Sequence, residues 1–192
     1  MKDVLVVVDY QNDFISPSGQ VAKRLGNDIL KKNQALAPKI QNLIDKWHKW
    51  KKPVVFVVSD YGIKHYKGWF KKIRTEMKNA YGGAAVKGTR GHELYELKSG
   101  KSDYFVVKHY FDGFYKTKLE DLLKKIKAGD IYICGANTDV CVFHTAIGSS
   151  FRGYRTFVIK DATETISPNK GLFLDYLDKY AGVRIISSNK II

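Results

Sequence analysis

The fold is decided by the stretch Ile131-Tyr132-Ile133-Cys134-Gly135-Ala136-Asn137-Thr138-Asp139-Val140-Cys141-Val142. Its apolar start predicts a buried strand, and Gly135 ends that strand. Thr138 and Asp139 are residue types that cap and begin a helix, so a strand, a short turn and a helix follow one another. Cys141 is then in the first turn of the helix, where unpaired N–H groups and the helix dipole favour thiolate over thiol. We therefore expect a nucleophilic Cys141 with a lowered pKa.

The same alternation continues on both sides of this stretch. Residues 60–100 are irregular and glycine-rich, and a long stretch without clear periodicity is often a functional loop region. Apolar runs predict strands at 3–8, 54–58, 104–107, 156–159 and 183–186, and helical spacing predicts helices at about 28–50, 119–128, 139–152 and 169–181. This alternation predicts an α/β protein of three layers, α-β-α, with a doubly wound, mostly parallel sheet in the middle.

Length and charge limit the class of protein. The chain has 192 residues, 44% of them hydrophobic, which predicts one folded domain over residues 1–192. The net charge of +14, from 33 basic and 19 acidic residues, raises the hypothesis of nucleic-acid binding. The lysines are scattered, however, and several fall on the polar faces of predicted helices. We therefore favour an enzyme with a lysine-rich surface and expect no nucleic-acid partner.

The apolar run Val4–Val8 is too short for a membrane span or a signal peptide, and Asp9 ends it. We expect a cytoplasmic protein without a membrane-embedded part. Two cysteines do not make a disulfide framework. Cys134 ends a buried strand and is expected in the core. Its spacing from Cys141 is not that of a C-x-x-C redox pair, and no fourth ligand completes a zinc site with these two and His144.

Three reactive side chains follow predicted strands. Asp9 and Lys108 come directly after their strands, and Cys141 lies just beyond a third. Ligands of open parallel sheets bind beyond the carboxyl ends of the strands, so these residues can line one crevice. A thiolate can attack a carbonyl carbon, a carboxylate can move the proton, and an ammonium can hold both anions. Taken singly, each residue also has an ordinary explanation as a turn, solvated or core residue.

Several ordered motifs of this chain resemble the isochorismatase-like superfamily of cysteine hydrolases, which includes nicotinamidases, N-carbamoylsarcosine amidases and ureido-compound hydrolases. The resemblance covers nearly the whole chain. Its anchors are Val6-Val7-Val8-Asp9-Tyr10-Gln11-Asn12-Asp13-Phe14, Lys87-Gly88-Thr89-Arg90-Gly91, Val107-Lys108-His109-Tyr110-Phe111-Asp112-Gly113-Phe114, the stretch from Cys134 to Val142, and Lys160-Asp161-Ala162.

The resemblance implies a catalytic triad of Asp9, Lys108 and Cys141, in which Lys108 lowers the pKa of Cys141. It implies a cis peptide bond between Ala136 and Asn137, and an oxyanion hole made by the backbone amides of Asn137 and Cys141. The implied reaction is thiolate attack, release of an amine and hydrolysis of a thioester. The resemblance also implies a homodimer or homotetramer. No cofactor is expected.

Nicotinamidases carry a metal site, typically Asp-x-His after the second strand and a further histidine. Here the segment reads Ser59-Asp60-Tyr61-Gly62, so Gly62 stands at the histidine position. Asp60 and His65 remain as weak metal-ligand candidates, and we expect no metal. The leading hypothesis is a hydrolase that cleaves an amide, carbamoyl or ureido C–N bond of a small molecule. The alternatives are a nicotinamidase or pyrazinamidase with an altered metal site and, from another class, a non-catalytic binding member.

The substrate pocket is assigned to aromatic residues near the predicted strand ends and in the 60–100 region. Such rings can wall a small planar pocket. An alternative of about equal weight is that some of them fill the core or a subunit interface. The candidates are Phe14, Tyr61, Trp69, Tyr110 and Phe114.

Overall fold

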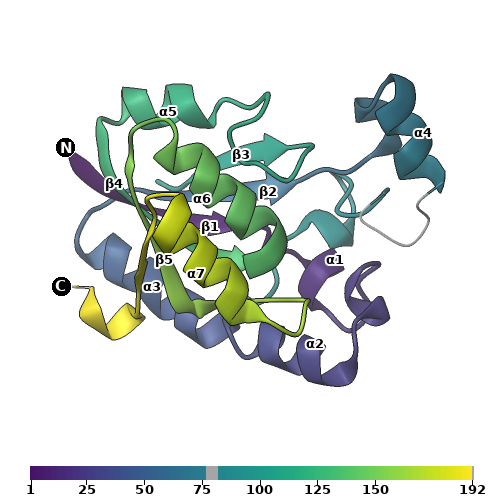
Figure 1. Ribbon diagram of the computed structural model, residues 1–192, viewed down its shortest axis with the longest axis horizontal. Helices are drawn as coiled ribbons and strands as arrows, with labels where there is room; N and C mark the ends of the chain where they lie inside the picture. Colours follow the sequence, from purple (N-terminus) through teal and green to yellow (C-terminus); the bar gives the residue numbers. More distant parts are fainter. Residues whose placement is uncertain (77–81, 192) are drawn as a thin grey trace.

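The apolar run at the start of the chain forms the central strand β1 (Lys2–Val8), in which Val4 to Val8 are completely or almost completely buried. In the computed structural model, which describes residues 1–76 and 82–191, the strands of the described residues form one sheet of order β3-β2-β1-β4-β5-β6 (Figure 1). All its pairings are parallel. The other strands are β2 (Val54–Ser59), β3 (Tyr104–Lys108), β4 (Ala128–Ala136), β5 (Arg155–Glu164) and β6 (Arg184–Ile186).

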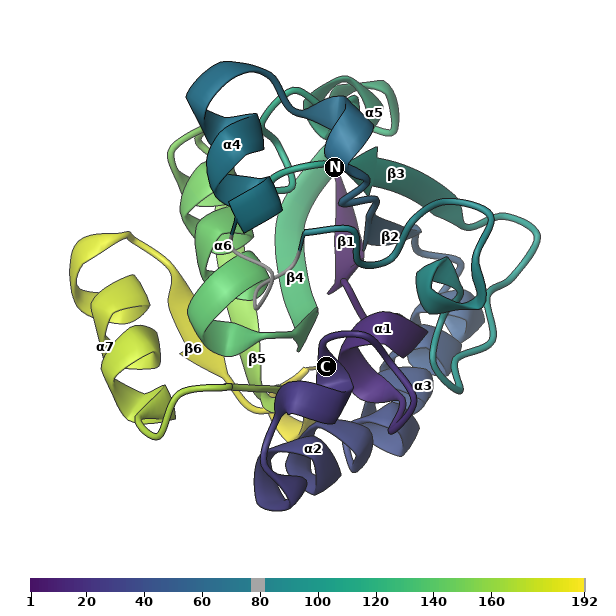
Figure 2. The same cartoon turned by 90° about the vertical axis from the view of Figure 1, so that its right-hand side faces the viewer.

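Helices cover both faces of the sheet, as Figures 1 and 2 show. One layer contains α1 (Asn12–Ile15), α2 (Asn27–Gln34) and α3 (Ala37–Lys49); the other contains α5 (Leu119–Lys125), α6 (Phe143–Ser150) and α7 (Lys170–Tyr180). Helix α3 buries Ile40, Leu43, Ile44 and Trp47 against the sheet, a spacing that puts them on one helical face. Because helices cover both faces, the strands are apolar on both sides. The three-layer α/β prediction is confirmed.

The structure differs from the sequence prediction in two places. The predicted helix at 28–50 is two helices, since the chain turns after Gln34 and α3 restarts with Pro38 in its first turn, where proline is well tolerated. The region 60–100 contains a helix that the sequence pattern did not reveal, α4 (Gly68–Glu76). It stands beyond the carboxyl ends of the strands (Figure 2). Residues 77–81 of this region lie outside the described residues.

No helix in the described part of the chain is long and apolar enough to cross a bilayer.

Gly135 shapes the end of β4. Its φ of +112° is a conformation that residues with a side chain rarely adopt. A Cβ atom here would lie 2.1 Å from the carbonyl oxygen of Val8 on the neighbouring strand. Glycine therefore lets β4 stay close to β1 while the chain turns toward Cys141.

We expect Gly135→Ala to lower the free energy of unfolding by about 3 kcal/mol or more, because it adds backbone strain and a clash with Val8. Urea denaturation followed by circular dichroism measures this. The matched control is Gly153→Ala, which has φ of +83° but nothing within 4 Å of the added Cβ. It should lose only about 1 kcal/mol. Equal losses in the two variants would show that the close approach of β1 and β4 does not require glycine.

Candidate active site

Four neighbouring strands end at one place. Asp9 follows β1, Ser59 is the last residue of β2, and Lys108 is the last residue of β3. Beyond β4, the π-helical segment Thr138–Val142 carries Cys141. The strand order runs outward in one direction from β1 to β3 and in the other from β4 to β6. The site thus lies beside the point where the order reverses, which is where open parallel sheets bind ligands.

The Lys108 ammonium is the centre of the site. The side chain is completely buried, and its Nζ lies 2.7 Å from Asp9 Oδ2. Nζ also lies within hydrogen-bond distance of Ser59 Oγ (2.9 Å), Tyr61 OH (2.8 Å), the Tyr110 carbonyl (3.0 Å) and Cys141 Sγ (3.3 Å). Burial alone would lower the pKa of Lys108, but Asp9 and Cys141 raise it above its ordinary value. Lys108 is therefore charged.

Asp9 is held from two sides. Its Oδ1 accepts a hydrogen bond from Ser59 Oγ at 2.8 Å, and its Oδ2 faces Lys108. Its backbone φ is +47°, a left-handed conformation that is strained for a residue with a side chain. Such strained residues cluster at functional sites. The turn that follows β1 thus directs this carboxylate into the buried polar cluster.

The Cys141 thiol is buried, with 2% of the residue exposed, and its sulfur lies 3.4 Å from Tyr61 OH. Burial raises the pKa of Cys141 to about 12, with a further increase from the charge of Asp9, and the opposing effect of Lys108 is smaller. The expectation of a lowered pKa is therefore wrong. Lys108 acts in the expected direction, but desolvation and a like charge outweigh it. Before substrate binds, Cys141 is therefore a thiol, with its sulfur 3.3 Å from Lys108 Nζ.

The turn between β4 and Cys141 contains a cis peptide bond between Ala136 and Asn137, as the resemblance implies. The Asn137 N–H has no acceptor among the described residues. Its side chain is fixed by a 2.8 Å bond to Asn33 Oδ1. The capping prediction is wrong: Thr138 Oγ1 bonds Thr163 and Asp139 accepts two backbone N–H groups near the end of β5, so neither caps the helix.

The structure places the five aromatic candidates for the substrate pocket in different surroundings. Tyr61 lies beside Cys141 through its hydroxyl, and Phe14 packs edge-on against the Tyr61 ring at 6.1 Å between ring centroids. Tyr110 contacts Lys108 through its carbonyl, and its ring packs on Tyr66 and Phe70.

Two of the candidates lie apart from this group. Trp69 is 70% exposed on α4, beside Lys72. Phe114 is buried in the core between Tyr154 and the Arg152 guanidinium, which explains its aromatic character without a ligand.

A cluster of metal-ligand types lies next to the site. Among the described residues, Asp60, His65 and His109 bring one ligand atom each within 4.8 Å of the others. His65 Nε2 lies 2.9 Å from Asp60 Oδ2. The imidazole of His65 is in the space that a side chain at position 62 would enter, since a Cβ on Gly62 would lie 3.4 Å from it. The sequence had suggested Asp60 and His65 but not His109, which follows the catalytic candidate Lys108.

As arranged, this cluster does not fit a metal ion. The rings of His65 and His109 are stacked at 3.7 Å with planes 13° apart. A metal binds an imidazole nitrogen in the plane of the ring, so two stacked parallel rings cannot both point a nitrogen at one cation. His109 Nδ1 is already 2.7 Å from the Asp60 carbonyl.

Sequence reasoning missed Ser59 and Gln11. Ser59 connects Asp9 and Lys108, and its N–H donates to Gln11 Oε1 at 2.7 Å. The completely buried Gln11 also donates to the Ser59 and His92 carbonyls. The strand-end criterion that selected Asp9 applies equally to Ser59, so the signal was present. Cys134 is buried in the core on the α3 face and Cys141 in the core on the opposite face, and both are free cysteines.

Comparison with known proteins identifies the family of this chain. A family model described as the isochorismatase domain matches residues 3–183. The nicotinamidase of Saccharomyces cerevisiae is 25% identical over 198 residues, which cover 85% of this chain and 88% of that protein. The crystal structure of N-carbamoylsarcosine amidase from Thermoplasma acidophilum is 28% identical with a TM-score of 0.79, covering 100% of this chain and 99% of that one. Pyrazinamidase of Pyrococcus horikoshii, solved with zinc, shares the fold at 22% identity and a TM-score of 0.80, with 97% and 99% covered. The chain belongs to the isochorismatase family of hydrolases.

Proposed function

We propose that this protein is a cysteine hydrolase that cleaves a C–N bond of a small amide, carbamoyl or ureido compound. The observation that carries the proposal is the buried Lys108 ammonium, which contacts the Asp9 carboxylate at 2.7 Å and the Cys141 sulfur at 3.3 Å. A cation, a carboxylate and a thiol together supply a nucleophile, its base and a charge that holds them in place. A structural ion pair would not need the thiol.

The reaction begins with transfer of the Cys141 proton to Asp9. The thiolate attacks the substrate carbonyl carbon, and the negative charge moves to the carbonyl oxygen. The N–H groups of Asn137 and Cys141 stabilise that oxyanion. Asp9 then gives its proton to the leaving nitrogen as the C–N bond breaks, and a thioester remains on Cys141. Asp9 takes a proton from water, and the resulting hydroxide attacks the thioester. The acid product leaves as Asp9 returns its proton to the Cys141 sulfur.

The raised pKa of Cys141 is compatible with this order of events. The thiol stays protonated until a substrate is present, and Asp9, which meets the same Lys108 ammonium as Cys141, is the carboxylate placed to accept its proton. Lys108 stays charged throughout, so it stabilises whichever of Asp9 and Cys141 carries the negative charge. The proton therefore moves between neighbours without a change in the total charge of the three groups.

Nicotinamide or pyrazinamide hydrolysis is the second candidate. It is favoured by the similarity to a nicotinamidase and by the aromatic ring of Tyr61, whose hydroxyl lies beside Cys141 and whose ring packs on Phe14. The stacked imidazoles of His65 and His109 argue against the metal site that the nicotinamidase resemblance implies. A purely binding function would leave the buried group of Asp9, Lys108 and Cys141 without a role. The cytoplasmic location and the dimeric or tetrameric state remain predictions.

We expect Cys141→Ala to reduce ammonia release from a panel of nicotinamide, N-carbamoyl amino acids and ureas by at least about a thousandfold, because no other group replaces the nucleophile. Asp9→Asn should cause a similar loss. Cys134→Ala, which removes the other cysteine from the core, is the control and should retain activity. An active Cys141→Ala variant would disprove the thioester mechanism.

The pH dependence of Cys141 alkylation tests the raised pKa. With a pKa of about 12, the rate with iodoacetamide should rise about tenfold per pH unit between pH 7 and 10, without a plateau. Removing the negative charge in Asp9→Asn should lower the pKa, so that this variant reacts faster than the unmodified protein although it is inactive. Lys108→Met should react more slowly, because the stabilising cation is lost. A plateau near neutral pH in the unmodified protein would contradict the raised pKa.

Removal of metal separates the two enzyme candidates. We expect that prolonged dialysis against EDTA leaves ammonia release unchanged, and that elemental analysis finds well below one metal ion per chain. His65→Ala should lower stability through loss of its contact with Asp60 without abolishing activity. Stoichiometric metal, with activity lost on its removal, would favour the nicotinamidase alternative instead.

A further inference from the structure

Helix α4 carries a buried arginine. Arg74 is 5% exposed, although α4 stands beyond the strand ends and is otherwise largely exposed. Its guanidinium lies near four aromatic rings, with Cζ about 5 Å from each ring centroid. The rings are those of Tyr61 at 5.1 Å, Tyr66 at 5.4 Å, Phe70 at 5.3 Å and Phe111 at 5.0 Å. A charged group is thus enclosed by apolar surface.

The hydrogen bonds of Arg74 are incomplete. Its Nε and Nη2 are buried and have no hydrogen-bond partner among residues 1–76 and 82–191. No ion pair of the described residues includes it, and the Asp9 carboxylate of the reactive group is paired with Lys108. Ring faces attract a cation but accept no N–H hydrogen bond of ordinary strength. A buried guanidinium that is never deprotonated needs an anion, or its burial is costly.

The unpaired atoms have the geometry of an anion site. Nε and Nη2 form one edge of the planar guanidinium, and such an edge binds the two oxygens of a carboxylate. Tyr61 connects this edge to the reactive group, since its ring contacts the Arg74 guanidinium and its hydroxyl lies 3.4 Å from Cys141 Sγ. One tyrosine side chain therefore separates the nucleophile from an uncompensated positive charge.

We propose that Arg74 binds a carboxylate of the substrate and so selects carboxylate-bearing amides or ureido acids. This rests on the proposed function, because it assumes that Cys141 attacks the same molecule. The charge of the other groups supports it. Asp9 and Lys108 form an ion pair with each other, whereas the Arg74 guanidinium has no ion-pair partner among the described residues and two unpartnered nitrogen atoms. A carboxylate one short chain away from the scissile bond would complete its hydrogen bonds.

A structural role for Arg74, as the residue that fixes α4 to the rings below it, makes a different prediction. In that case its loss would affect neutral and anionic ligands equally. The test must therefore compare two ligands that differ only in charge, in the same variant, so that any general disturbance of the site cancels.

The first experiment uses two thiol reagents on the full chain at pH 8.5, 2-carboxyethyl methanethiosulfonate and its uncharged propyl counterpart. Mass spectrometry measures the rate at which each modifies Cys141. The ratio of the charged to the uncharged rate should fall roughly tenfold or more in Arg74→Met, as expected for loss of a charge-assisted hydrogen bond. The ratio in Arg74→Lys, which keeps the positive charge but not the planar edge of the guanidinium, should lie between those of the unmodified protein and Arg74→Met.

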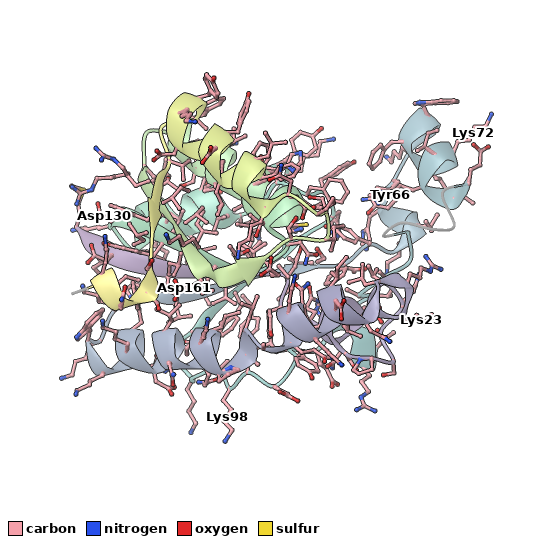
Figure 3. The ribbon with its side chains drawn as sticks, turned by 60° about the horizontal axis from the view of Figure 1, so that its bottom comes forward. Lys23, Tyr66, Lys72, Lys98, Asp130 and Asp161 are labelled. Carbon is pink, nitrogen blue, oxygen red and sulfur yellow. The ribbon has the colours of Figure 1, made fainter. Side chains whose placement is uncertain are left out.

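Lys72→Met is the matched control. It removes a positive charge from the same helix, but Lys72 is exposed and pairs with Glu76 (Figure 3). Its rate ratio should equal that of the unmodified protein. If Arg74→Met also leaves the ratio unchanged, the proposal is overturned. If Cys141 reacts with neither reagent at any pH, the proposed function fails first. The two failures are thus distinguishable.

The second experiment compares N-carbamoylglycine with isobutylurea, a neutral compound of similar shape. We expect ammonia release from the acid to have the higher kcat/KM, and Arg74→Met to lower this preference roughly tenfold or more, mainly through KM. A preference that survives in Arg74→Met would place the carboxylate site elsewhere. Preference for the neutral compound in the unmodified protein would also overturn the proposal.

Discussion

The buried ammonium of Lys108 is the constraint on which the rest of the site depends. A cation with no access to water must be surrounded by acceptors. Here five groups surround it: a carboxylate, two hydroxyls, a backbone carbonyl and a sulfur. A buried charge of this kind costs several kcal/mol unless it is matched. The lysine therefore fixes the relative positions of Asp9, Ser59, Tyr61 and Cys141, which come from three different parts of the chain.

The sheet makes this possible. Its parallel strands bring their carboxyl ends to one edge, and the hydrophobic residues on both faces hold each strand in register. Ser59 and Lys108 are direct partners in the pairing of β2 with β3, and Val8 is paired with Gly135 across β1 and β4. Register alone therefore places the serine beside the lysine, and it places the turn before Cys141 beside the one that carries Asp9. The polar cluster is built on the most rigid part of the molecule, which is what precise positioning of reacting groups requires.

Burial has a second consequence. It strengthens the interactions among the charged groups, but it also disfavours the thiolate. The net effect on Cys141 is a raised pKa, so the nucleophile is formed only when a proton can pass to Asp9. Around this neutral group, the guanidinium of Arg74 keeps its charge in an aromatic surrounding. The charges of the site are thus balanced near the sulfur and unbalanced a short distance away, where a substrate would lie.

The sequence by itself predicted the layers, the parallel strands and the choice of Asp9, Lys108 and Cys141 as candidate site residues, because apolar runs and strand ends are local patterns. It also supplied the motifs of the family. It did not determine that helix α4 exists. Nor did it show that Thr138 contacts β5, and Asp139 the residues that follow β5, in place of capping a helix. It also did not separate Phe114, which is in the core, from Phe14, which packs on Tyr61. Nor could it give the direction of the Cys141 pKa, since a helix start predicts one sign and burial beside a carboxylate produces the other. Those properties depend on which distant residues meet, and only the packed tertiary structure decides the solvation and the neighbours of each group.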